Sequence, residues 1–482
     1  MKKIYILLVI FFVAGKIYSQ NKEKFTSNDY VAALKKVTDV MVNDVTSPVA
    51  AARYYSYINL GSNEVSSLFN SSKNSFSQSI NDFKKIEAPE TLVAKSDASF
   101  ATVFTVYKMA KKLLPSGYLF TAEADSLMNS AIKKGIPKEK VEYTSQLVDV
   151  VVNQMMEYIK ADGFSKLSSY KKYTPLEGDG YWQPTGPAYM QAIEPNWYEI
   201  RPFFLQSSDQ FKPKAPAPFD LTKTSSFYKQ LEEVYTVVNK LSKKQRAIAS
   251  FWDCNPFILN QIGHIEFGLK KISPGGHWMG ITGIACLKKG TSLQQTVFIH
   301  STVAITLSDA FISCWDEKYR SNRIRPETAI NKWIDKRWKS VLQTPPFPEY
   351  TSGHSVISTA AATVLTHILG DNFSFTDTTE LEFGLPERKF KSFLQASQEA
   401  AISRLYGGIH YRDAIENGVL QGHQIGEFIS DKILKSDKMN VDFVKLEFFT
   451  QTINNEFKTK LFGTACSTGI HFLYFNTKES QS

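Results

Sequence analysis

The sequence predicts an all-α protein that folds as two helical halves. Apolar residues recur every three or four positions in long segments such as 30–45 and 140–163, which is typical of amphipathic helices. Strand-like alternation and the turn signals of hairpins are scarce, which argues against large sheets. The length of 482 residues exceeds what one ordinary hydrophobic core serves, so we expect two domains or one large helical unit of two parts.

The N-terminus has the pattern of a secretory signal peptide over residues 1–19. Two lysines precede an apolar run over residues 4–14, and the small residue Ser19 closes the segment. The run is shorter than the ~20 residues of a membrane-spanning helix, and we expect no later segment to be long and apolar enough to span a membrane. The first cysteine is Cys254, so no lipid-anchor cysteine follows the cleavage site. We therefore expect a mature protein that is secreted or periplasmic.

The composition indicates a folded protein with a mildly basic surface. Hydrophobic residues make up 43% and charged residues 21% of the chain, and the formal net charge is +9. Because no stripe of Lys and Arg and no nucleic-acid motif accompanies that charge, we expect no nucleic-acid partner. The four cysteines leave any disulfide pairing open, and without C-x-x-C or H-E-x-x-H spacing we expect no zinc.

A connector over residues 178–218 separates the two halves. Proline and glycine interrupt it throughout, which favours a long ordered segment packed on the surface over a continued helix or a flexible linker. Its large aromatic residues include Trp182, Trp197, Tyr198, Phe203 and Phe204. We place an N-terminal helical domain with its connector at 20–220 and a C-terminal helical domain at 221–440. Residues 441–482 give no clear signal.

The C-terminal domain contains three segments with residues suited to holding an anion. In the first, a helix predicted to end before Arg325 and Pro326 puts Lys318 on the same stripe as the apolar Leu307 and Phe311. An unpaired ammonium is costly to bury, so Lys318 would need an anionic partner there. The alternative is that Lys318 reaches solvent at the helix end.

The second segment, PFPEYTSGHSVISTAAATVLTHILG, begins at residue 346. Ser352 is a good N-cap for a helix that should end at Gly370. Free N–H groups at a helix start attract anions, Gly353 would let an anion approach the backbone, and His354 adds a ring nitrogen. The alternative is ordinary capping, with the histidine as a bystander.

The third segment, EAAISRLYGGIHYRDA, predicts a helix that runs into Arg404 and is broken by Gly407 and Gly408, with His410 just beyond. The guanidinium and the imidazole could converge on one point, although a basic helix C-terminus is the ordinary explanation. Taken together, the three segments supply three cations, neutral donors and two histidines. We interpret them as a site for a tetrahedral oxyanion with a histidine at its apex.

The three segments fit the ordered pattern K-x(6)-R-P, S-G-H and S-R-x(5)-H over residues 318–410. In this pattern the chain resembles the superfamily that joins type 2 phosphatidic acid phosphatases, bacterial acid phosphatases and vanadium-dependent haloperoxidases. The length, the connector and the contexts PPFPEYTSGHS and RPETAI are most similar to the chloroperoxidase-like branch. One departure is Thr351, where the phosphatase pattern often has proline. The resemblance implies two helical bundles with the anion site in the C-terminal bundle.

The resemblance to the haloperoxidases also implies a role for each residue. His354 would take a proton from hydrogen peroxide and Lys318 would polarise the peroxide, so that halide is oxidised to hypohalous acid, which modifies a small organic acceptor. An axial bond to vanadium would come from His410. The groups implied to hold the oxygens of vanadate are the side chains of Lys318, Arg325, Ser352 and Arg404 and the Gly353 amide.

The resemblance to the phosphatases implies a second use of the same scaffold. Phosphate would replace vanadate, His410 would attack the phosphorus of a phosphomonoester to form a phosphohistidine, and His354 would protonate the leaving alcohol. Trp315 and Phe347 are similar to aromatic residues near the halide side of the haloperoxidase pocket, with core packing as the alternative. Asp253 is loosely similar to an acid that orients the arginines.

The sequence therefore favours a secreted vanadium-dependent haloperoxidase, with a secreted acid phosphatase of the same superfamily as the alternative. A non-catalytic anion-binding protein is disfavoured, because binding alone needs no pair of histidines. The halide, the organic or phosphoester substrate and the oligomeric state stay open.

Overall fold

The structure is a computed structural model that describes residues 23–434, apart from 71–73, 78, 187–188, 257 and 263–264. Helices account for 61% of the protein and strands for 2%, so the prediction of an all-α fold is confirmed. The predicted signal peptide and residues 441–482 lie outside the described residues.

The helices lie on either side of the connector. The N-terminal half contains α1 (Ser27–Asn43), α2 (Pro48–Leu68), α3 (Glu90–Lys95), α4 (Ala98–Leu113), α5 (Phe120–Lys133) and α6 (Lys138–Lys160). The C-terminal half contains α7 (Ser226–Asn239), α8 (Lys243–Phe251), α9 (Pro274–Lys289), α10 (Leu293–Ser321), α11 (Pro326–Trp333), α12 (Gly353–Leu369), α13 (Phe393–Tyr406) and α14 (Arg412–Leu434).

Four strands and four short 3-10 helices complete the described elements. The strands form two antiparallel pairs, β1 (Ile258–Ile262) with β2 (Ile265–Leu269) and β3 (Phe375–Asp377) with β4 (Arg388–Phe390). The 3-10 helices are η1 (Gly117–Leu119), η2 (Phe164–Ser169), η3 (Trp197–Glu199) and η4 (Leu381–Phe383).

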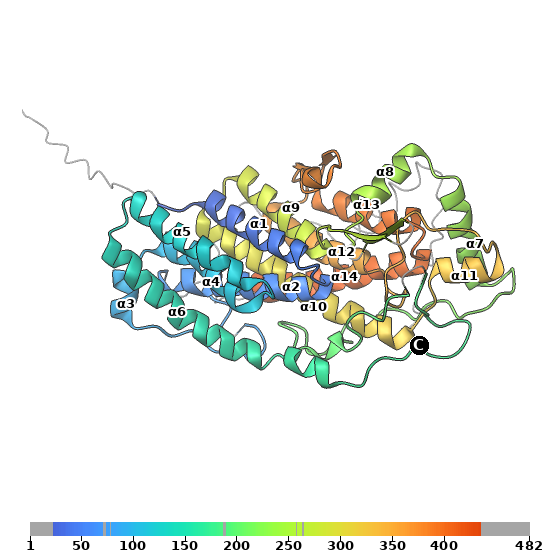
Figure 1. Ribbon diagram of the computed structural model, residues 1–482, viewed down its shortest axis with the longest axis horizontal. Helices are drawn as coiled ribbons and strands as arrows, with labels where there is room; N and C mark the ends of the chain where they lie inside the picture. The colour runs from blue at the N-terminus through green and yellow to red at the C-terminus, as the bar shows by residue number, and fades with distance from the viewer. Residues whose placement is uncertain are drawn as a thin grey trace, which may run out of the picture.

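Helix α10 runs through the middle of an elongated molecule. In Figure 1, α3, α5 and α6 lie at one end and α7, α8 and α11 at the other. Helix α10 packs against α2 from the N-terminal half and against α9, α12 and α14 from the C-terminal half. One continuous hydrophobic core includes residues of both halves, from Phe25 to Ile433. The division into domains at 20–220 and 221–440 stays a prediction.

Helix α10 also has the length and the apolarity of a membrane span, contrary to the expectation that no later segment would. Its most apolar stretch has a mean hydropathy of 1.5, and all of that stretch is buried inside the protein. A helix that is apolar all round is a core helix when other helices cover every side of it. Within the described part of the chain, no other helix meets the same criteria.

Glycines let α14 lie directly against α12. A Cβ added to Gly422 would lie 2.1 Å from the carbonyl oxygen of Val356, and one added to Gly426 would lie 2.9 Å from that of Ala360. Neither position has room for a side chain, so the two helices meet backbone to backbone. This contact holds the first turns of α12 in place.

The connector is ordered, as predicted, but several of its aromatic residues are buried rather than on the surface, whereas Tyr181 and Tyr189 are 40% and 69% exposed. Trp182 and Phe203 are no more than 2% exposed, and the segment is tied to α10 by Asp309. The Asp309 carboxylate accepts hydrogen bonds from the backbone N–H groups of Phe203 (2.7 Å), Phe204 (2.7 Å) and Leu205 (3.1 Å). The connector therefore forms part of the core, because a buried acid satisfies backbone groups that no helix or sheet pairs.

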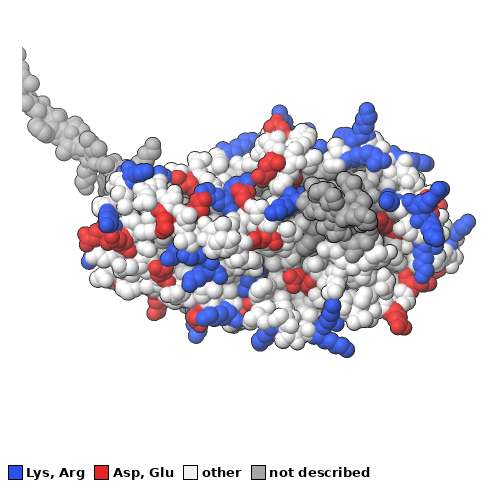
Figure 2. Space-filling model, viewed as in Figure 1, with Lys and Arg blue, Asp and Glu red and all other residues white. Residues whose placement is uncertain are grey.

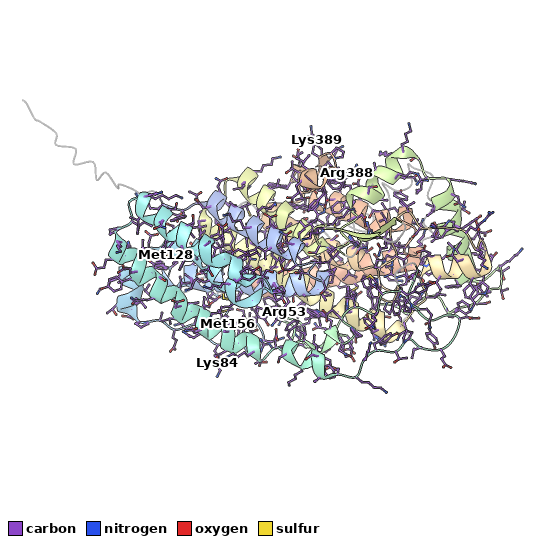
Figure 3. All side chains as sticks on the ribbon, in the orientation of Figure 1. Arg53, Lys84, Met128, Met156, Arg388 and Lys389 are labelled. Carbon is purple, nitrogen blue, oxygen red and sulfur yellow. The ribbon has the colours of Figure 1, made fainter. Side chains whose placement is uncertain are left out.

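Charged residues of both signs are interspersed over the face shown in Figure 2. This face shows no continuous stripe of Lys and Arg of the kind that nucleic-acid binding needs. Figure 3 places Arg53 among the central helices, whereas Arg388 and Lys389 lie at the edge of the molecule. The buried guanidinium of Arg53 is neutralised by Asp162, with 2.6 Å between Nε and Oδ2.

Candidate active site

The helix ends that position the predicted site residues lie where the sequence placed them. Arg325 is the N-cap of α11 with extended backbone (ψ 150°), as expected for a residue before Pro326. Ser352 is the N-cap of α12. Gly407 is the C-cap of α13, and Gly408 has a φ of +73°, which lets the chain turn back towards the helix.

A cavity of about 40 Å³ lies where these segments meet. This space exceeds what one water molecule needs and suits a small oxyanion. Four of the predicted residues line it, together with both predicted aromatic residues: Gly353, His354, Arg404, His410, Trp315 and Phe347. The other three predicted residues, Lys318, Arg325 and Ser352, are 0% exposed.

Lys318 does not reach solvent, so the alternative explanation of its position is wrong. Its ammonium donates to the backbone carbonyls of Pro348 (3.2 Å), Glu349 (3.1 Å) and Thr351, and lies 5.1 Å from the centre of the Phe347 ring. Burial lowers the pKa of Lys318 to about 8. The lysine thus holds the segment that leads into α12 and places a positive charge beside the start of that helix.

Arg325 and Arg404 add two buried guanidinium groups. Nη1 of Arg325 donates to the carbonyl of Ile409 (2.8 Å), while Arg404 donates to the Ser403 hydroxyl (2.9 Å) and to the carbonyl of Trp252. Burial lowers the pKa of each arginine to about 10. Within the described chain neither arginine forms an ion pair, so a bound anion would neutralise both.

Ser352 and Gly353 provide the neutral donors at the start of α12. The Ser352 hydroxyl oxygen accepts hydrogen bonds from the N–H (3.4 Å) and the hydroxyl (2.9 Å) of Ser355, which leaves its own hydrogen to donate. A Cβ added to Gly353 would meet only the ring of Trp315, at 3.8 Å. Packing therefore does not require glycine here, but glycine keeps the cavity open.

Gly353→Ala is expected to fold normally and to bind an oxyanion more weakly, because its methyl group would occupy part of the cavity. We expect the affinity for vanadate to fall about tenfold, or ~1.4 kcal/mol, in calorimetric titrations of anion-free protein. Gly275→Ala is the matched control, since a Cβ there meets no atom closer than 3.9 Å. An unchanged affinity in Gly353→Ala would show that the anion does not approach this helix start.

His410 presents Nε2 as an acceptor whose only partner among the described residues is Arg325. Its Nδ1 lies 2.8 Å from Oε1 of Glu349, and the same oxygen accepts the backbone N–H of Tyr411 (2.9 Å). Because that oxygen is an acceptor, Nδ1 carries the hydrogen and Nε2 the lone pair. Nη1 of Arg325 lies 3.2 Å from Nε2. Burial, and then Arg325, hold the pKa of His410 well below its usual value, so the ring is neutral.

Glu349 is the main residue that the sequence analysis missed. It is 0% exposed, and burial raises its pKa to about 7, against the opposing effect of Arg323, whose Nη1 lies 3.5 Å from Oε2. The glutamate fixes the orientation and the tautomer of His410. An acidic residue within the otherwise apolar and proline-rich PPFPEY was the available signal.

His354 is poised for proton transfer. Its Nε2 is buried and has no hydrogen-bond partner within the described chain. Burial, and then Arg404, hold the pKa of His354 well below its usual value, although a hydrogen bond with the Trp252 backbone raises it. The ring is therefore a neutral base that lines the cavity.

The remaining predicted residues lie close to the same cavity. The rings of Trp315 and Phe347 have centroids 5.0 Å apart and form an apolar part of the cavity wall. Asp253 also lines the cavity and partly opposes the lowering of the Arg404 pKa by burial, although its ion pair is with Lys271 (2.8 Å). The whole arrangement can hold an oxyanion among buried cations, bond to its central atom through His410 and move a proton through His354.

Comparisons with known proteins agree with this geometry. The family model of the VCPO second helical-bundle domain matches residues 298–436, which include all the predicted oxyanion-binding and catalytic residues. The chain is 44% identical to a bacterial vanadium-dependent iodoperoxidase of known crystal structure, over 85% of this chain and 97% of that one, with a TM-score of 0.79. No curated protein sequence matches the chain.

Two further crystal structures share the fold. A bacterial vanadium-dependent chloroperoxidase in its holo form is 15% identical over 81% of this chain and 93% of that one, with a TM-score of 0.60. The apo form is also 15% identical, over 81% of this chain and 94% of that one, with a TM-score of 0.62.

Proposed function

The chain belongs to the vanadium-dependent haloperoxidases, and we propose that it uses bound vanadate and hydrogen peroxide to oxidise iodide to hypoiodous acid. The observation that carries the proposal is a neutral His410 whose Nε2 accepts a hydrogen bond from Arg325, beside two buried arginines that form no ion pair within the described chain. One halide ion, one peroxide molecule and one proton would give hypohalous acid and water.

The residues fit vanadate. Two arginines have no ion pair, Gly353 leaves space at a helix start, and Nε2 of His354 has no partner among the described residues. Arg325, Arg404 and the Gly353 amide would hold the oxygens, and Nε2 of His410 would bind the metal. Vanadate held by these residues would supply the chemistry that activates hydrogen peroxide towards halide.

The protein's own groups would perform the proton transfers and the positioning. Nε2 of His354 would accept a proton from hydrogen peroxide, since it is neutral and lines the cavity. Lys318 would act indirectly. It would hold the segment that leads into α12 and add positive charge beside the start of that helix. Glu349 would keep Nδ1 of His410 protonated, so that Nε2 stays available. Trp315 and Phe347 would exclude water on one side of the cavity.

Iodide is the proposed halide because the 44% identical relative is an iodoperoxidase and because iodide is easier to oxidise than bromide or chloride. With vanadate and peroxide present, we expect the initial rate of halide oxidation to fall in the order iodide, bromide, chloride. Formation of triiodide and halogenation of a dye measure these rates. Faster oxidation of chloride than of iodide would contradict the proposed halide.

We also propose that residues 1–19 direct export of the protein, as their pattern predicts. The mass of the protein recovered from the medium or the periplasm tests this. A mature protein that begins near Gln20 is expected, and retention of the first nineteen residues in an exported protein would contradict it.

Small organic molecules that react with hypohalous acid would be the final acceptors.

A further inference from the structure

Cys254, His277 and Glu380 form a buried cluster beside the candidate active site, and the proposed reaction makes no use of it. Cys254 follows α8, His277 lies in the first turn of α9, and Glu380 precedes η4. The three side chains are at most 2% exposed. Three segments that are distant in sequence therefore bring a thiol, an imidazole and a carboxylate together inside the protein.

The three donor atoms lie at the spacing of metal ligands. Sγ of Cys254 is 3.3 Å from Nδ1 of His277 and 3.8 Å from Oε1 of Glu380, and Nδ1 is 3.2 Å from Oε1. The bond lengths of tetrahedral zinc place neighbouring sulfur, nitrogen and oxygen donors about 3.3–3.6 Å apart. One ion could thus contact all three atoms with little rearrangement.

The other side of the imidazole is held as in known metal sites. Nε2 of His277 lies 2.8 Å from Oδ2 of Asp377. Oδ1 of Asp377 accepts the backbone N–H (3.0 Å) and the hydroxyl (2.6 Å) of Thr379, so this carboxylate is itself fixed. The ring also stacks on Trp252, with centroids 4.6 Å apart and planes 16° apart. A carboxylate on the far nitrogen orients metal-binding histidines and raises their basicity.

With Nε2 donating to Asp377, the lone pair of Nδ1 faces the Glu380 carboxylate and the Cys254 sulfur. In the absence of a metal the Cys254 thiol donates its proton towards Oε1 of Glu380, and a metal ion would take the place of that proton. A proton can lie on only one of the three lines that join the atoms, whereas a metal ion contacts all three donors at once. We propose that Cys254, His277 and Glu380 bind zinc through Sγ, Nδ1 and Oε1, with Asp377 orienting the histidine.

The choice of zinc follows from the donors. Thiolate and imidazole together favour zinc over magnesium or calcium, which prefer oxygen ligands. Binding would release the Cys254 thiol proton to solvent. The expectation of no zinc rested on the absence of C-x-x-C and H-E-x-x-H, in which the ligands lie a few residues apart. It could not cover ligands that lie 23 and 126 residues apart in the chain.

The zinc would stabilise a segment that the active site uses. Trp252, two residues before Cys254, accepts a hydrogen bond from Arg404 through its carbonyl. The ion would join this segment to α9 and to the β3–β4 region. Its role would therefore be structural and would position Arg404 indirectly.

Untagged protein, freed of metal with a chelator and reloaded with zinc, tests the proposal by elemental analysis after gel filtration. We expect zinc equimolar with the chain in the wild type, and loss of most of it in Cys254→Ser and in the isosteric Glu380→Gln. Cys286→Ser is the control, because Cys286 is a buried free cysteine that lies outside the cluster. Vanadium is counted separately in the same samples.

Cobalt loading of the wild type gives a readout that needs no variant. A thiolate-to-cobalt charge-transfer band in the near ultraviolet, with intense visible bands of a tetrahedral ion, is the expected spectrum. Its absence, or only substoichiometric zinc in the wild type, would overturn the proposal in favour of a hydrogen-bonded charge network. An equal zinc content in the folded Cys254→Ser variant and in the wild type would also overturn the proposal.

Discussion

His410→Ala is expected to abolish halide oxidation. The variant loses the Nε2 that Glu349 keeps unprotonated beside Arg325, and the proposal gives His354, the other histidine of the cavity, the separate role of proton acceptor. A reaction that depends on this bond should fall to the rate of free vanadate and peroxide in solution. The initial rate of iodide oxidation at saturating vanadate measures the effect.

The matched control is His367→Ala. His367 pairs with Glu427 (2.9 Å) and does not line the cavity, so its loss should leave the rate unchanged. Because His410→Ala also removes the partner of the buried Glu349, thermal unfolding must confirm that the variant is folded. A folded His410→Ala protein with near wild-type activity would exclude His410 as the residue that binds vanadium.

Arg404→Ala is expected to weaken vanadate binding by roughly 100-fold, equivalent to about 3 kcal/mol. The guanidinium is buried and lines the cavity without an ion pair in the described chain, so its bonds to an oxyanion would be charge-assisted in a water-poor site. Arg404→Lys should recover only part of the affinity, because an ammonium cannot reproduce the two-pronged donor geometry. Calorimetric titration with vanadate provides the dissociation constants.

Arg388→Ala serves as the control for that series. Arg388 pairs with Glu399 (2.6 Å) at the edge of the molecule and does not line the cavity. Its loss should leave the vanadate affinity unchanged. If Arg404→Ala and Arg388→Ala bound vanadate equally well, the cavity described above would not be the oxyanion site.

The site residues could be predicted because each one stands next to a local signal. Pro326 ends a helix before Arg325, Ser352 starts one, and the two glycines after Arg404 end another. Such signals act within a few residues, so the sequence alone reveals them. The order of the three segments along the chain then sufficed to indicate an oxyanion site.

Long-range partners could not be predicted in the same way. Glu349 meets His410 across 61 residues, and Asp309 pairs with backbone groups more than 100 residues away. Only packing decides which buried acid finds which donor. The same limit explains why the buried position of the connector and the Cys254 cluster were missed.

The most direct test of the account is to titrate anion-free protein with vanadate while iodide oxidation by peroxide is followed. Activity should be absent without vanadate, should saturate at one vanadate per chain, and should be inhibited by phosphate, because the same donors fit both tetrahedral anions. Full activity without vanadate would contradict the account. Turnover of a phosphomonoester that vanadate inhibits, with no halide oxidation at any vanadate concentration, would instead establish the phosphatase alternative.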